Sequence, residues 1–429
     1  MIRRFLAVNK NELPKKKLGR IFIIIGIILF PLLSSLYIVS VNSDRLINGT
    51  LSLIILILAC YSFVTLIAGI FFYKTGTDKI NKRLKKSFRI VLSTIAIIYV
   101  VGGYSIVTIL YFPGSKFKDW LITTAMTTMN HQYFATWFYD DYDVNKVLAN
   151  NVVIETGEET NPDLIVFTEP DFNQVTYKTE YERDIFTKDE GNDLYKIIDI
   201  SRDGFKGKLA IIYDPSKVKL GISRGIGDEL QSSYGQFITE ISSRYNAVIA
   251  INAGGFYDPD WNSTGGVPHG IVISDGKLIA NNSKANSSGG IIGFNKENKL
   301  ILSKMTAKEA LAAGIRDAVD FGPFLIVNGN PSFVKGNGGW GDAPRTAIGQ
   351  RADGIVLLLV IDGRQAGSIG ADMNDLTQIM LDYGAINAAN LDGGTSTAMS
   401  LNGQIISNPR NGNFQAKTRP VPNAWIVVE

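Results

Sequence analysis

Three long apolar runs in the first quarter of the 429-residue chain place the strongest constraint on its fold. They cover residues 21–41, 51–73 and 90–112, and each is nearly free of charged side chains. A helix of roughly 20 apolar residues is long enough to cross the hydrocarbon core of a bilayer. The runs therefore predict a membrane anchor of three transmembrane helices over residues 1–112. The first run is too long for the apolar part of a secretory signal peptide, and no Ala-x-Ala cleavage site follows it.

The distribution of basic residues predicts the orientation of this anchor. Lysine and arginine are concentrated before the first run and between the second and third runs, whereas the loop between the first and second runs carries only Arg45. Because excess Lys and Arg stay in the cytoplasm, the N-terminus and the 74–89 loop are expected inside, and everything after residue 112 outside. The sequence thus predicts a multi-pass cell-membrane protein with the lipid bilayer as a partner. The basic clusters are interpreted as topology signals, so no nucleic-acid partner is expected.

Cysteine and histidine are too scarce for several classes of site. The single cysteine, Cys60, lies in the second apolar run, so the part after residue 112 has no thiol and no disulfide. That part is roughly 300 residues long, which is enough to bury a core without disulfides. Only two histidines occur, His131 and His269, and two cannot build a multi-histidine zinc site. For His131 we expect a polar helix face.

The sequence pattern of the part after residue 112 changes along its length. Residues 113–193 are predicted to form a juxtamembrane helix, over 116–139, and a polar connector. From residue 194 onward short apolar strands alternate with turn signals, of which Asp275-Gly276 and Asn402-Gly403 are the clearest. Further hairpins are expected within 289–304, 320–333 and 346–362, and helices over 228–244, 306–313 and 373–383. Residues 194–429 are therefore predicted to be an extracytoplasmic α+β domain with a mixed, mostly antiparallel sheet and a few helices.

Four loops that carry glycine follow apolar strands of this domain. A polar residue at the end of a buried strand, followed by glycine, lets backbone N–H groups approach a ligand closely. One Asp-Gly loop is a common turn, but four in one domain, together with Arg345 in "APRTAIG", predict a shared site. The candidate loop residues are Asn252, Gly254, Gly255, Phe256, Gly322, Asp362, Gly363, Asp392, Gly393, Gly394, Thr395 and Ser396.

Several kinds of chemistry fit these loops poorly. A kinase phosphate loop of the Asp-Gly-Gly-Thr type commonly lies near the start of its domain, whereas Asp392 lies near the end of the chain, and no Walker sequence occurs. A serine hydrolase lacks its Gly-x-Ser-x-Gly elbow. No cofactor is required. A divalent cation held by Asp362, Asp392 and carbonyl groups stays open, although no ligand-spacing motif supports it.

An anionic substrate fits the candidate residues better. Arg345 is suited to bind a phosphate through two parallel hydrogen bonds. Asp362 and Asp392 are suited to act as nucleophile, base or ligand of a sugar hydroxyl, while Asn252 and the glycine N–H groups orient the substrate. The structural alternatives are a surface ion pair for Arg345 and turn capping for the two aspartates.

Six motifs, in the order "INAGGF", "PHGIVISDGK", "DFGPFLIVNG", "PRTAIG", "VIDGR" and "NLDGGTSTAM", resemble the phosphodiester glycosidase family. The resemblance covers roughly residues 195–429 and departs from the family pattern at Ala253 and Thr395, which could narrow the site. It implies hydrolysis of a sugar-1-phosphodiester, with glycosidic C–O cleavage, on a phosphate-bearing cell-envelope glycan or polymer. It also implies that Asp392 is the nucleophile or base and that Arg345 binds phosphate, with Asp362 and His269 as secondary ligands or proton donors.

Two other functions stay open at this stage. One is a non-catalytic module that binds a phosphate-bearing wall polymer, and the other is a transglycosylating role in exopolysaccharide or wall-polymer metabolism. The sequence also leaves open which aspartate attacks, and whether the anomeric configuration is retained or inverted.

Overall fold

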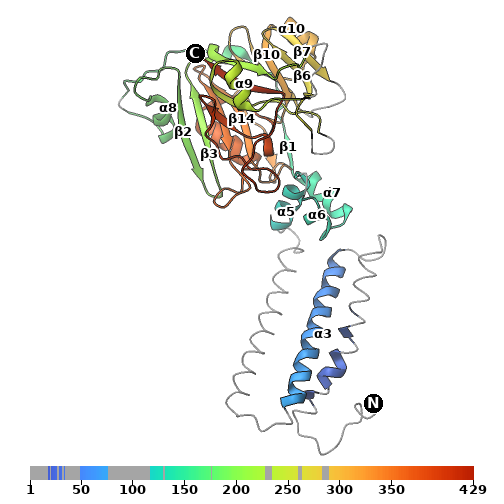
Figure 1. Cartoon of the computed structure of the whole chain (residues 1–429). Helices are drawn as coiled ribbons and strands as arrows, with labels where there is room; N and C mark the ends of the chain where they lie inside the picture. Colours follow the sequence, from blue (N-terminus) through green and yellow to red (C-terminus); the bar gives the residue numbers. More distant parts are fainter. Residues whose placement is uncertain are drawn as a thin grey trace, which may run out of the picture. The chain divides into compact units, whose positions relative to one another are not determined.

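The computed structural model describes residues 18–19, 21–26, 29–30, 33, 49–75, 116–128, 131–174, 176–227, 234–258, 263–282 and 289–429 (Figure 1). The chain divides into two compact units. The first consists of Met1–Ile122 and Tyr133–Val147, and the second of Thr123–Gln132 and Leu148–Glu429.

The predicted three-span anchor is contradicted by the structure. Among the described residues, none of the helices combines the length and the apolarity that crossing a membrane requires. An apolar run does not make a span by itself, because the segment must also form one helix with both properties. The expected multi-pass localisation, its orientation and the bilayer as a partner are corrected with it. The run over 90–112 and most of the run over 21–41 lie outside the described residues.

Among the described residues, the helices that belong to the first unit or cross its boundary include α3 (Gly49–Thr75), α5 (Lys116–Met126), α6 (Tyr133–Thr136) and α7 (Asp141–Asn150). Within this unit Lys118 of α5 forms an ion pair with Asp143 of α7 at 2.8 Å. The single helix expected over 116–139 is two helices. At the end of α5 the hydroxyl groups of Thr127 and Thr128 bond back to the carbonyls of Thr123 and Ala125, and such bonds compete with the helical ladder.

The second unit is built from four antiparallel sheets. A seven-stranded sheet has the order β12 (Asn330–Pro331), β11 (Phe324–Val327), β16 (Ala385–Asn390), β14 (Arg345–Arg351), β15 (Val356–Ile361), β3 (Phe205–Ile212) and β2 (Tyr195–Arg202). One five-stranded sheet has the order β7 (Lys277–Asn282), β6 (Gly270–Ser274), β10 (Ile315–Phe321), β8 (Gly290–Asn295) and β9 (Leu300–Ser303). The other has the order β18 (Gln404–Ile405), β17 (Met399–Leu401), β5 (Ala247–Asn252), β19 (Asn423–Val428) and β4 (Val218–Ile222). Strands β1 (Val152–Ile154) and β13 (Phe333–Lys335) form a separate pair.

Short helices connect these strands: α8 (Glu180–Phe186), α9 (Ile238–Arg244), α10 (Ala307–Ala312) and α11 (Met373–Asp382), with the 3₁₀ turns η1 (Pro162–Leu164), η2 (Pro215–Lys217) and η3 (Gly394–Ser396). The prediction of a mixed α+β domain on a mostly antiparallel sheet is therefore confirmed. Residues 228–233 of the helix expected over 228–244 lie outside the described residues, and α9 forms its C-terminal part.

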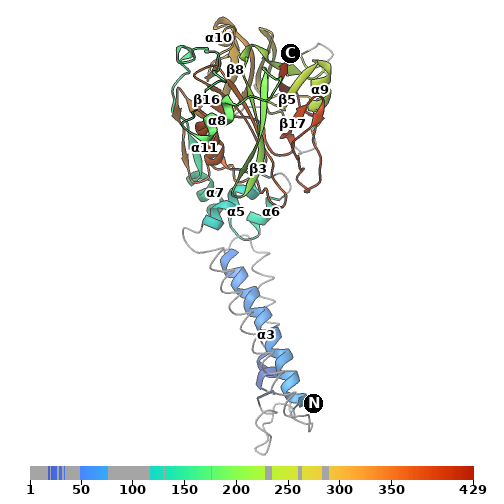
Figure 2. The ribbon, with the colours of Figure 1, turned by 90° about the vertical axis from the view of Figure 1, so that its left-hand side faces the viewer.

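The three larger sheets pack their inner faces around one central core. Side chains of β15 show the arrangement, because Leu358 points into this core while its neighbours Leu357 and Leu359 point to the opposite face. Strand β19 alternates in the same way, with Trp425 inside and Ile426 outside. Helices cover the outer faces: α11 packs on the seven-stranded sheet, α9 on β5 and β19, and α10 on β10 and β7. Figure 2 shows α11 and α9 on opposite sides of the layered sheets.

The expected two-residue turns are present where the sequence places them. Asp275 and Gly276 join β6 to β7, and Asn402 and Gly403 join β17 to β18, all four with positive φ, as tight hairpins require. The hairpins β8–β9 and β14–β15 also form. The hairpin expected within 320–333 forms as β11–β12, whereas Asp320 and Phe321 belong to β10 in the five-stranded sheet.

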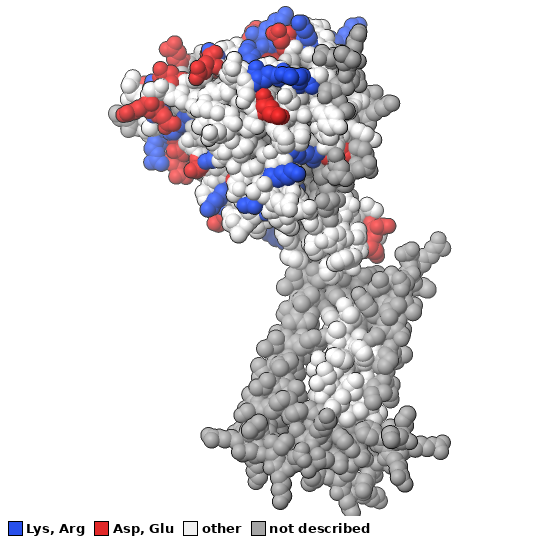
Figure 3. All heavy atoms as spheres, in the orientation of Figure 1, with Lys and Arg blue, Asp and Glu red and all other residues white. Residues whose placement is uncertain are grey.

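Charged side chains are spread over the second unit. On the face drawn in Figure 3, acidic and basic groups are interspersed and no large area of one sign stands out.

Candidate active site

The loop of Asp392 begins where β16 leaves the seven-stranded sheet. Its position is fixed by β5, since the Asp392 N–H donates to the Ala253 carbonyl (3.0 Å) and the Asn252 side-chain amide donates to the Asp392 carbonyl (2.6 Å). The Gly394 N–H donates in turn to the Pro344 carbonyl (2.8 Å), just before β14. The loop is thus held by strand ends from two different sheets.

Asn252 supports the Asp392 loop through its side-chain amide. It is fully buried, and its side-chain oxygen accepts bonds from the Thr346 hydroxyl (2.7 Å) and the Ala398 N–H (3.2 Å). Both ends of its amide are therefore occupied by the protein. The geometry gives Asn252 a supporting position, which differs from the expected contact with a substrate.

The Asp392 carboxyl group lies in an unusual environment. The residue keeps some exposed surface, yet it is set so deeply among protein atoms that burial raises its pKa above the ordinary value. The Ser396 hydroxyl, the Arg419 guanidinium and the Gly393 N–H oppose this rise in the pKa, and Asp258 adds to it. The Gly393 N–H donates to Asp392 Oδ1 at 3.0 Å.

Ser396 is the last residue of η3, two positions after Gly394, and only 2% of its surface is exposed. Its hydroxyl is near enough to Asp392 to lower the pKa of that carboxyl group. However, no hydrogen bond of ordinary geometry reaches the Ser396 Oγ within the described part of the chain.

Arg345 begins β14 and is 4% exposed. Its Nε donates to the Ala371 carbonyl (3.1 Å), and its Nη2 donates to the carbonyls of Trp340 and Gly341 (2.6 Å each). Burial lowers its pKa to about 10, so the guanidinium stays positively charged near neutral pH. The surface ion pair considered as an alternative is not found among the described residues.

One nitrogen of Arg345 faces the Asp392 loop. No hydrogen bond to Nη1 is found in the described ranges, and a Cβ built on Gly393 would lie 3.7 Å from this atom. Nη1 is thus the nitrogen of Arg345 that lies nearest to Gly393.

A second guanidinium, that of Arg364, lies on the other side of the loop. Its Nη1 donates to the Thr395 hydroxyl (3.2 Å), and a Cβ on Gly394, where φ is +63°, would lie 3.1 Å from its Nη2. Burial and the charge of Arg419 lower the pKa of Arg364 to about 10. Arg364 ends the sequence motif "VIDGR", but the sequence pattern does not mark it as a site residue. Arg419, which forms an ion pair with Asp258, carried no sequence signal at all.

Asp362 occupies a different environment from Asp392. Its Oδ1 accepts the Asn408 N–H (2.8 Å), and its main-chain carbonyl accepts the Ser368 hydroxyl (2.6 Å). Burial raises its pKa, against the Asn408 N–H and Lys208, and no contact with Asp392 is found among the described residues. Asp362 therefore holds the turn after β15. Gly363 is required by packing, because a Cβ there would lie 2.6 Å from the Pro344 nitrogen.

The loop after β5 packs against neighbouring side chains and contributes the ring of Phe256 to the site. The Gly254 N–H donates to the Asn423 side chain (2.8 Å). A Cβ on Gly255 would lie 3.2 Å from Nδ1 of His269. Phe256 is buried, and the Arg419 guanidinium lies 4.3 Å above the centre of its ring.

His269 and Gly322 complete the set of predicted residues. Burial lowers the pKa of His269 and Asp320 raises it, so the two groups face each other near Gly255. The Gly322 carbonyl accepts a hydrogen bond from the side-chain amide of Asn390 (2.9 Å). Asn390 lies two residues before Asp392 in the chain. The structure thus gathers Asp392, Arg345, Arg364, Thr395 and Ser396 around one loop, while Asn252, Gly322 and Asp362 hold the surrounding chain.

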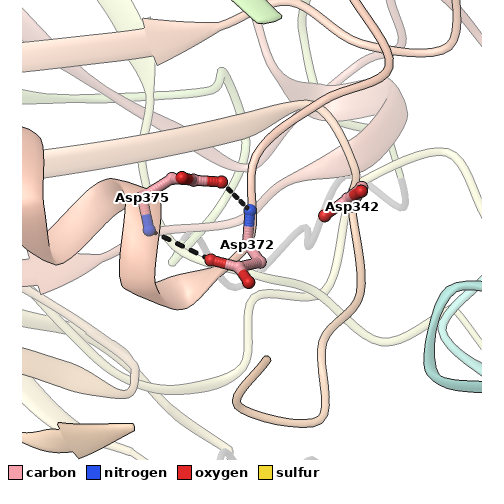
Figure 4. Close-up of side chains that lie close together, drawn as sticks. All are labelled: Asp342, Asp372 and Asp375. Carbon is pink, nitrogen blue, oxygen red and sulfur yellow. Dashed lines mark hydrogen bonds between the residues drawn. The ribbon is translucent and has the colours of Figure 1, made fainter. Parts of the chain in front are cut away.

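Three carboxylates near Arg345 could offer ligands to a metal ion. Oxygens of Asp342, Asp372 and Asp375 lie within 4.8 Å of one another (Figure 4). Two of the three already cap α11, because the Asp375 N–H donates to Asp372 Oδ1 and the Asp372 N–H donates to Asp375 Oδ2, each at 3.0 Å. Burial raises the pKa of Asp375 to about 6, against the Asp372 N–H, and the other two aspartates add to the rise. Helix capping therefore accounts for two of these carboxylates without a metal.

Comparison with known proteins places this site in a described family. The family model for phosphodiester glycosidases matches residues 245–428. The chain is 31% identical over 183 residues to the SPbeta prophage-derived uncharacterized protein YomE of Bacillus subtilis (strain 168). The match covers 41% of this chain and 27% of that protein. It is 27% identical over 168 residues to the N-acetylglucosamine-1-phosphodiester alpha-N-acetylglucosaminidase of Mus musculus, covering 33% of this chain and 30% of the mouse protein. The chain thus spans less than a third of the length of these relatives.

Among solved structures, the catalytic domain of zebrafish N-acetylglucosamine-1-phosphodiester alpha-N-acetylglucosaminidase, auto-inhibited by its pro-peptide, is similar with a TM-score of 0.47. It is 22% identical, and the likeness covers 56% of this chain and 86% of that one. The matched residues 245–428 contain the Asp392 loop, both guanidiniums and the strands that hold them. Residues 245–428 of this chain are a domain of the phosphodiester glycosidase family.

Proposed function

We propose that the protein hydrolyses a sugar-1-phosphodiester by breaking the bond between the anomeric carbon and the phosphate oxygen. The observation that carries the proposal is the placement of the Asp392 carboxyl group in a loop flanked by the guanidiniums of Arg345 and Arg364. The name of the mouse relative supports N-acetylglucosamine as the first sugar to test.

The reaction is balanced without a cofactor. Water adds its oxygen to the anomeric carbon, and the bond from that carbon to the phosphate oxygen breaks. The electron pair leaves with the phosphate monoester, one proton of the water is released, and the sugar is freed as a hemiacetal. Phosphate is a good leaving group, so protonation of the leaving oxygen matters less than in ordinary glycosidases.

Each residue around the loop has a role in this proposal. Asp392 faces the anomeric carbon and either attacks it or takes the proton of the attacking water. Its raised pKa makes its carboxylate a stronger base than that of an ordinary aspartate, which favours the second role. Nη1 of Arg345 and the guanidinium of Arg364 offset the charge that grows on the departing phosphate. Gly393 and Gly394 let the phosphate come close, because a side chain at either position would meet the two arginines.

The direct test is the Asp392→Asn variant of the full chain, assayed on methyl N-acetylglucosamine-1-phosphate. We expect kcat to fall by about 10³-fold, as for the loss of a nucleophile or general base. Asp362→Asn is the matched comparison: it removes the same charge from the end of β15 in the same sheet, and we expect a much smaller loss, of no more than about tenfold. Full turnover by Asp392→Asn would refute the role given to this residue.

The same assay separates the other functions. Retention of the substrate without release of sugar would indicate a binding module, and transfer of the sugar to an added alcohol in preference to water would indicate a transglycosylase. We further propose that the natural substrate is a cell-envelope glycan or polymer that carries sugar-1-phosphodiesters, so a wall-polymer fragment belongs in the substrate panel.

A further inference from the structure

A positively charged cavity adjoins the Asp392 loop and is not used by the hydrolysis proposed above. Its volume is about 550 Å³, and it is lined by Arg364, Gln365, Ala366, Ile369, Arg410 and Phe414. Two guanidiniums and no carboxylate line it. Arg364 is shared with the loop, because its Nη1 donates to the Thr395 hydroxyl, and the same nitrogen donates to the Arg410 carbonyl (3.5 Å).

The two guanidiniums lack anionic partners. No ion pair to Arg364 or Arg410 is found within the described part of the chain. Nε of Arg410 is buried without any hydrogen bond there, and its Nη1 donates only to the Phe414 carbonyl (3.2 Å). A buried donor that carries charge is costly to leave without an acceptor, so this arrangement favours an anion in the cavity.

The backbone around the cavity is held in a costly conformation. Seven described residues other than glycine have positive φ, and five of them are asparagine or aspartate, which tolerate this region. The other two are Arg364 (φ 59°) and Phe414 (φ 62°), and both line this cavity. Strain of this kind persists only where the surrounding contacts impose it, and it is concentrated at functional sites.

Contacts hold both strained residues in place. The Arg364 N–H donates to the Ile369 carbonyl (3.0 Å), which closes the turn after β15. The Phe414 ring packs 5.7 Å from the ring of His131, and the Phe414 N–H donates to the Asn411 carbonyl (3.0 Å). The cavity walls are therefore built before any ligand enters.

We propose that this cavity binds a second anionic group on the leaving-group side of the substrate. The inference rests on the proposed function, because it places the scissile phosphate between Arg345 and Arg364. The chain of the leaving group then continues past Arg364 to Arg410. The preferred substrate is a sugar-1-phosphodiester whose alcohol portion carries a further phosphate, and Arg410 is a specificity residue for that phosphate.

The test compares two substrates of the full-length protein. One is methyl N-acetylglucosamine-1-phosphate, and the other is the diester of N-acetylglucosamine-1-phosphate with glycerol 3-phosphate, which has a second phosphate. We expect the wild type to favour the second substrate in kcat/KM by at least about tenfold at low salt, and the preference to weaken as salt is added. Arg410→Met keeps the apolar stem but removes the charge, and we expect the preference to disappear through a rise in KM.

Lys417→Met is the matched control. Like Arg410→Met, it removes one positive charge, but from an exposed position that does not line the cavity. We expect this variant to keep the preference for the substrate with two phosphates. An unchanged preference in Arg410→Met, or an equal loss in both variants, would overturn the inference.

A binding measurement separates this inference from the proposed function. If the wild type turned over neither substrate, the proposed function would fail, and calorimetry with glycerol 1,3-bisphosphate would then decide the inference. Binding to the wild type that is at least about tenfold weaker in Arg410→Met supports the cavity as an anion site, whereas equal binding to both proteins, or none to the wild type, rules it out.

Discussion

The two aspartates that follow β15 and β16 look equivalent in sequence but differ in their surroundings. Each ends an apolar strand and precedes glycine, so the sequence could not separate them. In the structure, Asp362 accepts the Asn408 N–H and holds a turn, whereas the Asp392 carboxyl group accepts the Gly393 N–H and interacts with the charges of Arg419 and Asp258. The difference depends on residues far away in the chain, which a linear pattern does not contain.

The pKa of Asp392 leads to a prediction for the pH dependence of catalysis. If the ionised carboxylate is the reactive form, activity is lost as pH falls through its raised pKa. Arg419 lowers this pKa and Asp258 raises it. We therefore expect Arg419→Met to move the acid limb of kcat/KM to higher pH, and Asp258→Asn to move it to lower pH.

Because Arg419 and Asp258 form an ion pair, each substitution also leaves its partner's charge unbalanced, which reinforces the expected direction. The measurement is a pH profile of kcat/KM for the wild type and both variants. Movement of the two profiles in the same direction would contradict the assignment of this limb to Asp392.

Arg345 illustrates how far sequence reasoning reaches for a single side chain. In the structure its Nη1 lies nearest to Gly393. Its other nitrogens donate to the carbonyls of Ala371, Trp340 and Gly341, and no sequence pattern indicates these contacts. Its proposed contact with phosphate stays a prediction.

At the scale of elements, β15 shows why the sheet strands were recognisable. Its sequence, "VLLLVI", is apolar at every position because both faces of the seven-stranded sheet are covered. Leu358 is fully buried in the central core. Leu358→Ala is expected to lower the free energy of unfolding by about 2–5 kcal/mol, through lost burial and the cavity left behind.

Chemical denaturation of the full chain measures this loss. Leu278→Ala, at a leucine of β7 that is 42% exposed, is the matched control and is expected to change stability by no more than about 0.5 kcal/mol. Equal effects of the two substitutions would contradict the layered core.

Turns were predicted better than sheet membership. The conformation at Asp275-Gly276 and Asn402-Gly403 is decided by the two residues themselves, which adopt positive φ. In contrast, the separation of β10 and β11 into different sheets depends on their pairing with β8 and β16, which lie elsewhere in the chain. Local chemistry cannot report such pairings.

At the scale of the whole molecule, the order of motifs was more informative than any single one. Six short motifs predicted the phosphodiester glycosidase family, and the family match over residues 245–428 confirms it. Strands β3 and β4 precede this range but pair with β15 and β19 inside it, so the fold of the second unit extends beyond the matched residues. The anchor prediction was wrong because it took apolar composition alone as evidence for spanning helices.

The central claim is that the bond at the anomeric carbon breaks, and the fate of the water oxygen tests it most directly. The full-length protein is incubated with methyl N-acetylglucosamine-1-phosphate in ¹⁸O-labelled water, and the products are analysed by mass spectrometry after brief reaction. We expect the label in the released sugar and an unlabelled methyl phosphate. Label in a phosphate product, or no release of sugar by the wild type, would contradict the account.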